Sequence, residues 1–246
     1  MSCRIGRGQT RLWILFAPLS LCFSSLVSQE VDLPVKHVEK SIEGWTIHVD
    51  QRLTVEPNKD LGKRALALLR SRLADIVMVM QSEPRTKLQE VPIWLDLDYG
   101  DLASMQYHPS VDWLVNNGYS AELAKCVHIP IASQFIEPRH QQTQPWCVLH
   151  ELAHAYHDQV LDFQDARIVE AWKEYVDSHH GDRALHVNGK AVRHYALTNQ
   201  KEFFAEMTEA YFGTNDFFPF VQGELRQAEP AIYELLREVW GPSPLD

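Results

Sequence analysis

Four residues between positions 150 and 157 are of the types that bind metal ions and move protons. In the stretch HELAHAYHD they are His150, Glu151, His154 and His157. Residues four apart on a helix share one face, so His150 and His154 could bind one metal ion together. Two imidazoles and a carboxylate suit Zn²⁺, so one zinc ion per chain is the expected cofactor. Glu151 would then be placed to take a proton from water as a general base.

The residues that flank this motif decide whether it is more than a coincidence. A four-residue pattern alone carries an appreciable false-positive risk, and the alternative is a solvated surface helix rich in histidine. The flanking side chains are apolar, which predicts a buried helix: Val148, Leu149, Leu152, Ala153 and Ala155. Buried histidine and glutamate without partners would be costly, so the sequence favours a metal site.

A third protein ligand is expected from NQKEFFAEMTEAYF, residues 199–212, which has the pattern of a second helix. Glu202 and Glu206 lie one turn apart there, beside Phe203 and Phe204. Carboxylates in so apolar a setting indicate a metal ligand or a hydrogen-bonded pair. We expect Glu202 to be the ligand, and Glu206 could accept the second ring proton of a ligand histidine.

These motifs resemble the catalytic domain of the anthrax toxin lethal factor and related gluzincin metallopeptidases. That family pairs HExxH with the pattern YxxTNxxEFFAE, and this chain has HELAH at 150–154 and YALTNQKEFFAE at 195–206. The resemblance extends from Trp146 to Gly213 and excludes the toxin's other domains. The resemblance therefore implies a stand-alone secreted relative, and the toxin's substrates cannot be transferred to it.

Matched position by position, the resemblance implies three zinc ligands and one general base: His150, His154, Glu202 and Glu151. It also implies that the Tyr195 hydroxyl stabilises the oxyanion of the tetrahedral intermediate. Without the family pattern, Tyr195 would be interpreted as a packing residue, and His194 is the obvious substitute for its role. Asn199 and Glu206 are expected to support the ligand side chains.

The remaining histidines are given lesser roles. His157 could compete as a ligand, but three histidines at spacings of four and three cannot all face one ion. We therefore expect it behind the ligands or at the surface. His179, His180 and His186 fall near predicted loops and are expected to be solvated.

The elements that position these residues are predicted from apolar spacing and turn-forming residues. The first half predicts a strand–helix–strand unit with strand 44–55, helix 58–81 and strand 91–97, separated by a break at 82–90. A loop-like stretch follows at 98–124, whose aromatic part, 105–119, could rim the cleft. CVHIPIA, residues 126–132, is predicted as an edge strand because Pro130 cannot donate to a central ladder. Such an edge could pair with extended substrate.

The second half predicts helices with one hairpin. The histidine helix opens at Pro145, and the other elements are a helix at 165–178, a hairpin at 184–196 around Asn188–Gly189, the helix at 199–212 and a final helix at 231–240. Taken with the resemblance, this organisation predicts an α+β, zincin-like fold with two lobes. A mixed sheet with helices would form the upper lobe, mainly helices the lower one, and the zinc cleft would lie between them.

The N-terminal residues predict export. Arg4, Arg7 and Arg11 precede the uncharged stretch LWILFAPLSLCFSSLV, which is typical of a signal peptide over residues 1–28. The expected product is a single catalytic domain, residues 29–246, in the extracellular space or periplasm and free of the membrane. An uncleaved membrane anchor is the alternative. Of the four cysteines, Cys126 and Cys147 would remain, either as a disulfide or as two buried thiols.

The composition is that of a globular protein. The 246 residues are 45% hydrophobic and 23% charged, which suits one domain with a proper core. The net charge of −10, without a run of Lys or Arg, argues against a nucleic-acid binder. The sequence thus predicts a secreted zinc metallopeptidase acting on peptides or proteins, with no particular oligomeric state. The alternatives are a zinc-binding interaction module without catalysis and a hydrolase of non-peptide amides or esters.

Overall fold

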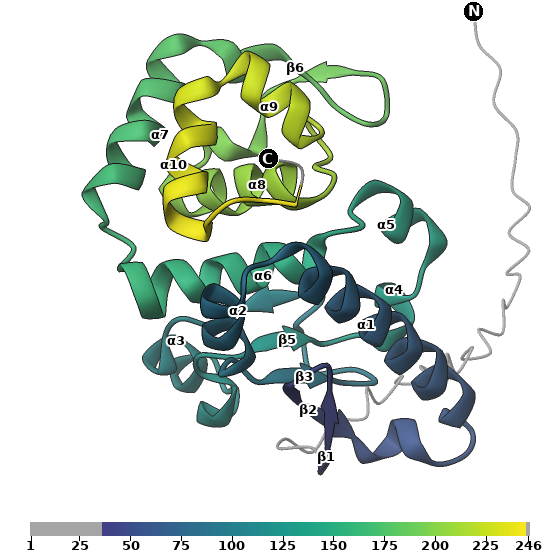
Figure 1. Ribbon diagram of the computed structural model, residues 1–246. Coiled ribbons are helices and arrows are strands. Elements are labelled where there is room, and N and C mark those ends of the chain that lie inside the picture. The colour runs from purple at the N-terminus through teal and green to yellow at the C-terminus, as the bar shows by residue number, and fades with distance from the viewer. Residues whose placement is uncertain (1–35, 245–246) are drawn as a thin grey trace, which may run out of the picture. The chain divides into compact units, whose positions relative to one another are not determined.

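The computed structural model describes residues 36–244 (Figure 1). The predicted signal peptide and its cleavage site lie outside these residues. Among the residues that are described, no helix combines the length and the apolar character needed to cross a membrane. The fold is α+β, with a mixed sheet and helices, as predicted from the sequence.

A five-stranded sheet occupies the first half of the chain, in the order β1-β2-β3-β5-β4. Its strands are β1 (His37–Ile42), β2 (Trp45–Asp50), β3 (Ile93–Leu95), β4 (Gln106–Tyr107) and β5 (Val127–Ile129). The central strands β2, β3 and β5 run parallel, while β1 and β4 lie antiparallel at the two edges. Strand β1 was not predicted, because its side chains are mostly exposed and show no alternation. Glu43 and Gly44, both with positive φ, form the tight turn that joins it to β2.

The predicted edge position of β5 is wrong. This strand pairs with β3 on one side and with β4 on the other, so it lies inside the sheet. Pro130 comes directly after the strand, and its missing N–H therefore interrupts no ladder bond. The true edge is β4, which comes from the stretch predicted to be a loop. Two residues are too few to show a strand periodicity.

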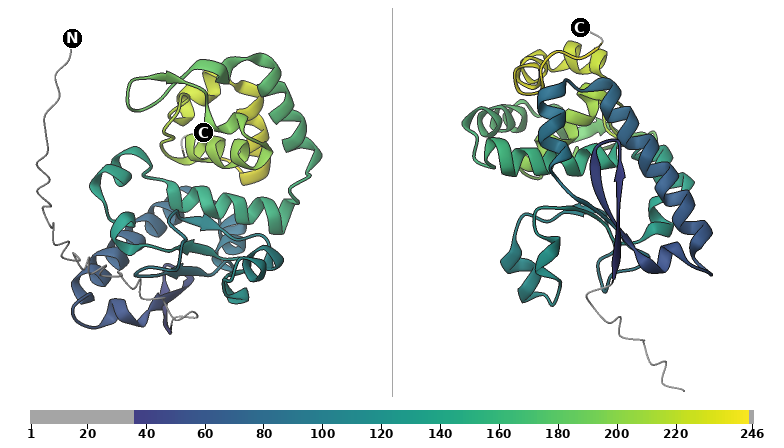
Figure 2. Two further views of the ribbon diagram at one scale, coloured as in Figure 1. Left: turned by 180° about the vertical axis from the view of Figure 1, so that it is seen from behind. Right: turned by 60° about the horizontal axis from the view of Figure 1, so that its bottom comes forward.

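The two faces of the sheet belong to different hydrophobic clusters, because neighbouring side chains on a strand point to opposite faces. Ile93 and Leu95 join the main core with residues of α1 (Lys59–Val79) and α6 (Cys147–Tyr156). Trp94 joins a smaller cluster with Leu114 of α3 (Val111–Asn116). The helices α1 and α3 accordingly lie on opposite sides of the sheet (Figure 2).

Helix α1 confirms the predicted helix, but the predicted break after it is wrong. Residues Ser82–Gln89 form the short helix α2, with Pro84 in its first turn. Proline is tolerated there because the first N–H groups of a helix have no partner within it. The two remaining helices before α6 are α4 (Ala132–Phe135) and α5 (Pro138–Thr143).

The second half of the chain is helical, as predicted, apart from one hairpin. Its elements are α6, α7 (Ala166–Ser178), β6 (Ala184–Leu185), β7 (Ala191–Val192), α8 (Gln200–Phe212), α9 (Gln222–Ala228) and α10 (Pro230–Trp240). The predicted hairpin is confirmed by the antiparallel pairing of β6 with β7. Helix α6 begins two residues after Pro145 and continues into a π-helical turn, His157–Leu161. It lies between the sheet and the later helices (Figure 1).

The two cysteines are buried free thiols, so the disulfide alternative is excluded for the described fold. Cys126 belongs to the small cluster beside Trp94, whereas Cys147 belongs to the main core. Burial raises the pKa of the Cys147 thiol to about 12, which keeps it protonated and unreactive at neutral pH.

Candidate active site

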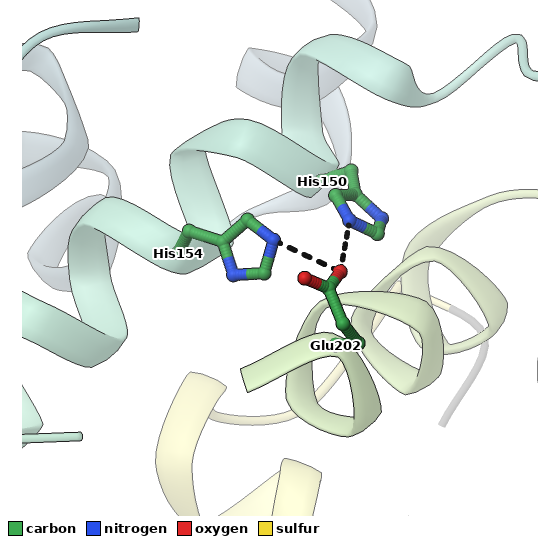
Figure 3. A group of neighbouring side chains, drawn as sticks. All are labelled: His150, His154 and Glu202. Atoms are coloured by element: carbon green, nitrogen blue, oxygen red, sulfur yellow. Dashed lines mark hydrogen bonds and ion pairs between the residues drawn. The ribbon is translucent and has the colours of Figure 1, made fainter. Parts of the chain in front are cut away.

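The three expected metal ligands come together between α6 and α8 (Figure 3). The Nε2 atoms of His150 and His154 lie 3.2 and 3.3 Å from the same carboxylate oxygen, Oε2 of Glu202. One ligand atom from each of the three residues lies within 4.8 Å of the other two. Two imidazole nitrogens and a carboxylate oxygen, converging in this way, form a donor set that fits a divalent transition metal such as Zn²⁺.

Helix α6 presents its histidines to α8 because its other faces are buried. Leu149, Leu152 and Ala153 are fully covered in the main core, which leaves His150 and His154 on the remaining face. Helix α8 begins at Gln200 because Asn199 caps its N-terminus. The Asn199 side chain accepts hydrogen bonds from the backbone N–H groups of Lys201 and Glu202, at 2.9 and 3.0 Å. Asn199 thus supports Glu202 through the backbone.

Glu151 lies beside this group and is held by the sheet. The backbone N–H of Tyr107, in edge strand β4, donates to Glu151 Oε2 at 2.8 Å. Burial raises the pKa of Glu151, while the charges of His150 and His154 act in the opposite direction. A carboxylate with a raised pKa beside a metal-binding group is suited to accepting a proton.

The hydrogen bond with His150 Nδ1 that was predicted for Glu206 is made by Glu209, and Glu206 lies beside it as a further carboxylate near the ring. His150 Nδ1 lies 2.7 Å from Glu209 Oε1 but 3.9 Å from Glu206 Oε1. Sequence reasoning missed Glu209, although a signal was present. Glu202, Glu206 and Glu209 follow the spacing i, i+4, i+7, which places all three on one face of α8.

Several acids are buried around this face of α8. Glu206 and Glu209 are 3% and 5% exposed. Burial raises the pKa of both carboxyls, aided at Glu206 by the charge of Glu209 and at Glu209 by the charge of Asp216. For Glu202 the opposite holds: burial is outweighed by hydrogen bonds with His150 and His154, which lower its pKa. Glu202 is therefore the carboxylate of the three that stays ionised most readily, as a metal ligand must.

Tyr195 lines the cleft, whereas His194 does not. Tyr195 begins a short 3₁₀-helix, Tyr195–Leu197, just after strand β7, and is 47% exposed. Burial, followed by the charge of Glu202, raises its pKa, so the phenol stays protonated and able to donate. His194, the alternative, is fully buried and accepts the N–H of Ala196 at 3.1 Å. It cannot reach a substrate in the cleft.

The cleft has a volume of about 800 Å³. His150, Glu151, His154, Tyr195 and Glu202 all contribute to its wall, as do Glu206 and Glu209. The first part of the predicted aromatic rim also lines it, from Met105 to Tyr107 and at Pro109. Trp113 is instead exposed on α3, away from that lining.

The other histidines differ partly from expectation. His179 and His180 are exposed, as predicted, and pair with Asp182 and Glu229. His186 is only 18% exposed and lies beside Asp216 at 3.5 Å. His157 is fully buried against Phe163 and Phe204, neither at the surface nor behind the ligands. Neither of its ring nitrogens has a hydrogen-bond partner in the described part of the chain.

Replacing His157 by phenylalanine is therefore predicted to stabilise the protein. At pH 7 the expected gain is about 1–2 kcal/mol, because two buried nitrogens without partners are removed. Burial, and next the charge of His154, lowers the pKa of His157 to about 4. Below about pH 6.5 the unfolded chain therefore binds a proton that the folded chain does not. The free energy of unfolding consequently decreases as the pH is lowered. The native protein should lose about 2 kcal/mol more than His157→Phe between pH 7 and 5.

Urea unfolding of both proteins at pH 7 and pH 5 measures this difference. Met78→Gln serves as the control, because that side chain is exposed on α1 and does not titrate, so its replacement should leave both values nearly unchanged. A His157→Phe protein that is less stable than the native one at both pH values would contradict the prediction.

Comparison with known proteins agrees with this geometry. Residues 131–240 match the model of the glucose-regulated metallo-peptidase M90 family, a stretch that includes α6, α8 and Tyr195. The match covers somewhat less than half of the chain. No curated protein and no solved structure matched it. Similarity to the M90 metallo-peptidases, over the elements that carry the candidate site, supports a metal-dependent peptidase and hence a hydrolase.

Proposed function

We propose that this protein is a zinc-dependent metallopeptidase of the gluzincin type, with a zincin-like, two-lobed domain and the active site in its cleft. The observation that carries the proposal is the convergence of His150, His154 and Glu202 next to Glu151 in one cleft of about 800 Å³. The family match supports the metallopeptidase class. Zinc is preferred because two imidazoles and one carboxylate are its usual catalytic ligands. When bound there, zinc would supply a polarised water and a Lewis acid for the scissile carbonyl.

The side chains of this protein would carry the proton transfers. Glu151 would accept a proton from the attacking water and would later pass it to the leaving amine. The Tyr195 hydroxyl would donate a hydrogen bond to the oxyanion as the tetrahedral intermediate forms. Glu209 would keep His150 in one orientation by accepting a hydrogen bond from its Nδ1–H group.

Strand β4 is the proposed binding site for an extended substrate. His108 exchanges backbone hydrogen bonds with Lys125 and Cys126 on the β5 side, so its chain neighbour Tyr107 faces outward. The Tyr107 N–H is used by Glu151. Met105, two residues earlier, has the same outward direction and lines the cleft. A peptide could therefore add to β4 as a further strand, in the role first predicted for residues 126–132.

The proposal is tested by measuring zinc and peptide cleavage on one preparation of residues 29–246. We expect one zinc per chain by elemental analysis and cleavage of a mixed peptide library. A chelator should abolish the cleavage, and added zinc should restore it. Zinc without any cleavage would favour a binding module or a non-peptide substrate. Absence of zinc would remove the whole proposal.

Tyr195→Phe is predicted to lower kcat by about 10²-fold, with little change in zinc content, because one oxyanion donor is lost. Phenylalanine keeps the ring and removes only the hydroxyl. The measurement is kcat and KM on one peptide, with Tyr119→Phe, outside the cleft lining, as the control. An unchanged kcat would show that Tyr195 only lines the cleft and has no chemical role.

The non-catalytic alternative is disfavoured by the position of Glu151 and Tyr195. A module that only binds zinc has no use for a held carboxylate and an exposed phenol beside its ligands. Hydrolysis of a non-peptide amide would use the same residues, and strand β4 favours peptides over it. We further propose export to the extracellular space or periplasm, on the basis of residues 1–28.

A further inference from the structure

We propose that Asp158 is a positioning residue for Glu151 and acts through Tyr107; the inference rests on the proposed function. Tyr107 contacts the histidine helix and its continuation at two points. Its backbone N–H donates to Glu151 Oε2 at 2.8 Å, and its phenol donates to Asp158 Oδ2 at 2.6 Å. Asp158 makes no hydrogen bond or ion pair with either ligand histidine within the described chain, and its contact with Tyr107 links it to Glu151.

The contact between Asp158 and Tyr107 is reinforced on both sides. Lys125, just before β5, forms an ion pair with the same oxygen of Asp158. Gln159 Nε2 donates to the Tyr107 hydroxyl at 3.1 Å. Asp158 and Gln159 both belong to the π-helical turn His157–Leu161, and such turns are frequent at functional sites. We call Tyr107, Lys125, Asp158 and Gln159 the strand clamp.

The strand clamp is strong enough to fix a short strand. Tyr107 is 6% exposed and the Asp158 side chain 15% exposed, so water competes little for their hydrogen bond. Hydrogen bonds to an ionised carboxylate are about twice as strong as neutral ones. Burial and the hydrogen bond to Asp158 raise the pKa of Tyr107, which keeps its phenol a donor. Strand β4 is only two residues long and lies at the edge of the sheet, so it needs such an anchor.

Glu151 depends on the position of this strand. In the described part of the chain, the N–H of Tyr107 is the hydrogen-bond donor that the structure gives to Glu151. A donor at one oxygen of a carboxylate fixes the orientation of the group and leaves the other oxygen free to face water. If β4 drifted by an ångström, this orientation would be lost while the metal ligands stayed in place.

The test compares Asp158→Asn, Asp158→Glu and Tyr107→Phe with the native chain, using a peptide from the library screen. Tyr107→Phe removes the hydroxyl and leaves the backbone N–H in place. We expect Asp158→Asn and Tyr107→Phe each to lower kcat about 10-fold, within the range of outer-shell effects, with KM changed less than about threefold and zinc content unchanged. The double variant should be no worse than either single one, because both break the same contact. Asp158→Glu keeps the carboxylate and should recover most of the loss.

A second readout needs no activity. Hydrogen exchange of the Tyr107 amide should be at least about 10-fold faster in Asp158→Asn, because the strand opens more often. Asp177→Asn, an exposed carboxylate on α7, is the control and should change neither exchange nor kcat.

The outcomes separate this inference from the proposed function. A native chain that cleaves peptides, with kcat unchanged in Asp158→Asn and Tyr107→Phe, would overturn the strand clamp alone. A loss of kcat that follows loss of zinc or of thermal stability would show a merely structural role and overturn it too. A native chain that binds zinc and cleaves nothing would overturn the proposed function, and the clamp's catalytic role with it.

Discussion

Glu151→Gln is expected to lower kcat by about 10²–10⁴-fold, the range that a general base usually contributes. The amide of glutamine has nearly the same shape, so it can still accept the Tyr107 N–H, but it cannot take a proton from water. Because Glu151 is not one of the three residues whose ligand atoms converge, the zinc content should stay at the native value. The variant therefore separates proton transfer from metal binding.

Single-turnover kinetics on one peptide, together with zinc analysis of the same sample, measure this effect. The matched control is Glu137→Gln, an exposed glutamate that lines the same cleft. It should keep kcat within about twofold, as expected for a surface substitution away from the reacting atoms. A Glu151→Gln protein with nearly native kcat would mean that another group takes the proton. A protein that also lost its zinc would mean that Glu151 has a structural part in the metal centre.

Replacing the three carboxylates of α8 one at a time is expected to give a graded loss of zinc affinity. Glu202→Gln should lose most, because it removes a ligand atom that lies within 3.3 Å of both histidine Nε2 atoms. Glu209→Gln should weaken binding by about 10–100-fold, the usual effect of losing the partner of a ligand histidine. Glu206→Gln should weaken binding least, because its nearest approach to His150 Nδ1 is 3.9 Å.

Competition with a chromophoric chelator gives the three affinities on one scale. Each variant is isosteric and lies on the same helix, so each serves as a control for the other two. Glu206→Gln is the informative one. If it weakened zinc binding more than Glu209→Gln, the assignment made from sequence would be right and the geometry of the His150 contact would be wrong. Equal effects of all three would point to loss of helix α8 itself, which circular dichroism would detect.

The residues of the candidate metal centre could be predicted because their signals are local. His150 and His154 are four apart, and one helical turn places them on one face whatever the rest of the chain does. Asn199 and Gly213 mark the ends of α8 in the same local way. The helices α1, α6, α7, α8 and α10 were predicted for this reason, within a few residues at each end. The proposed role of Tyr195 needed the resemblance to a known family, since a single tyrosine has no periodicity.

Contacts between distant segments were not predictable in this way. Glu206 and Glu209 lie on the same face of α8, and only the angle at which α8 crosses α6 decides which one meets His150. The depth at which His157 is buried depends on Phe163 and Phe204 from two other segments.

Strand β4 shows the same limit in the sheet. Two residues have no pattern of their own, and their pairing with β5 joins segments about twenty positions apart. The sequence by itself thus determined the candidate metal-binding residues and the helices that carry them, through spacing along single helices. Only the tertiary structure decided which carboxylate supports His150 and which strand holds Glu151, because those choices depend on how separate elements pack together.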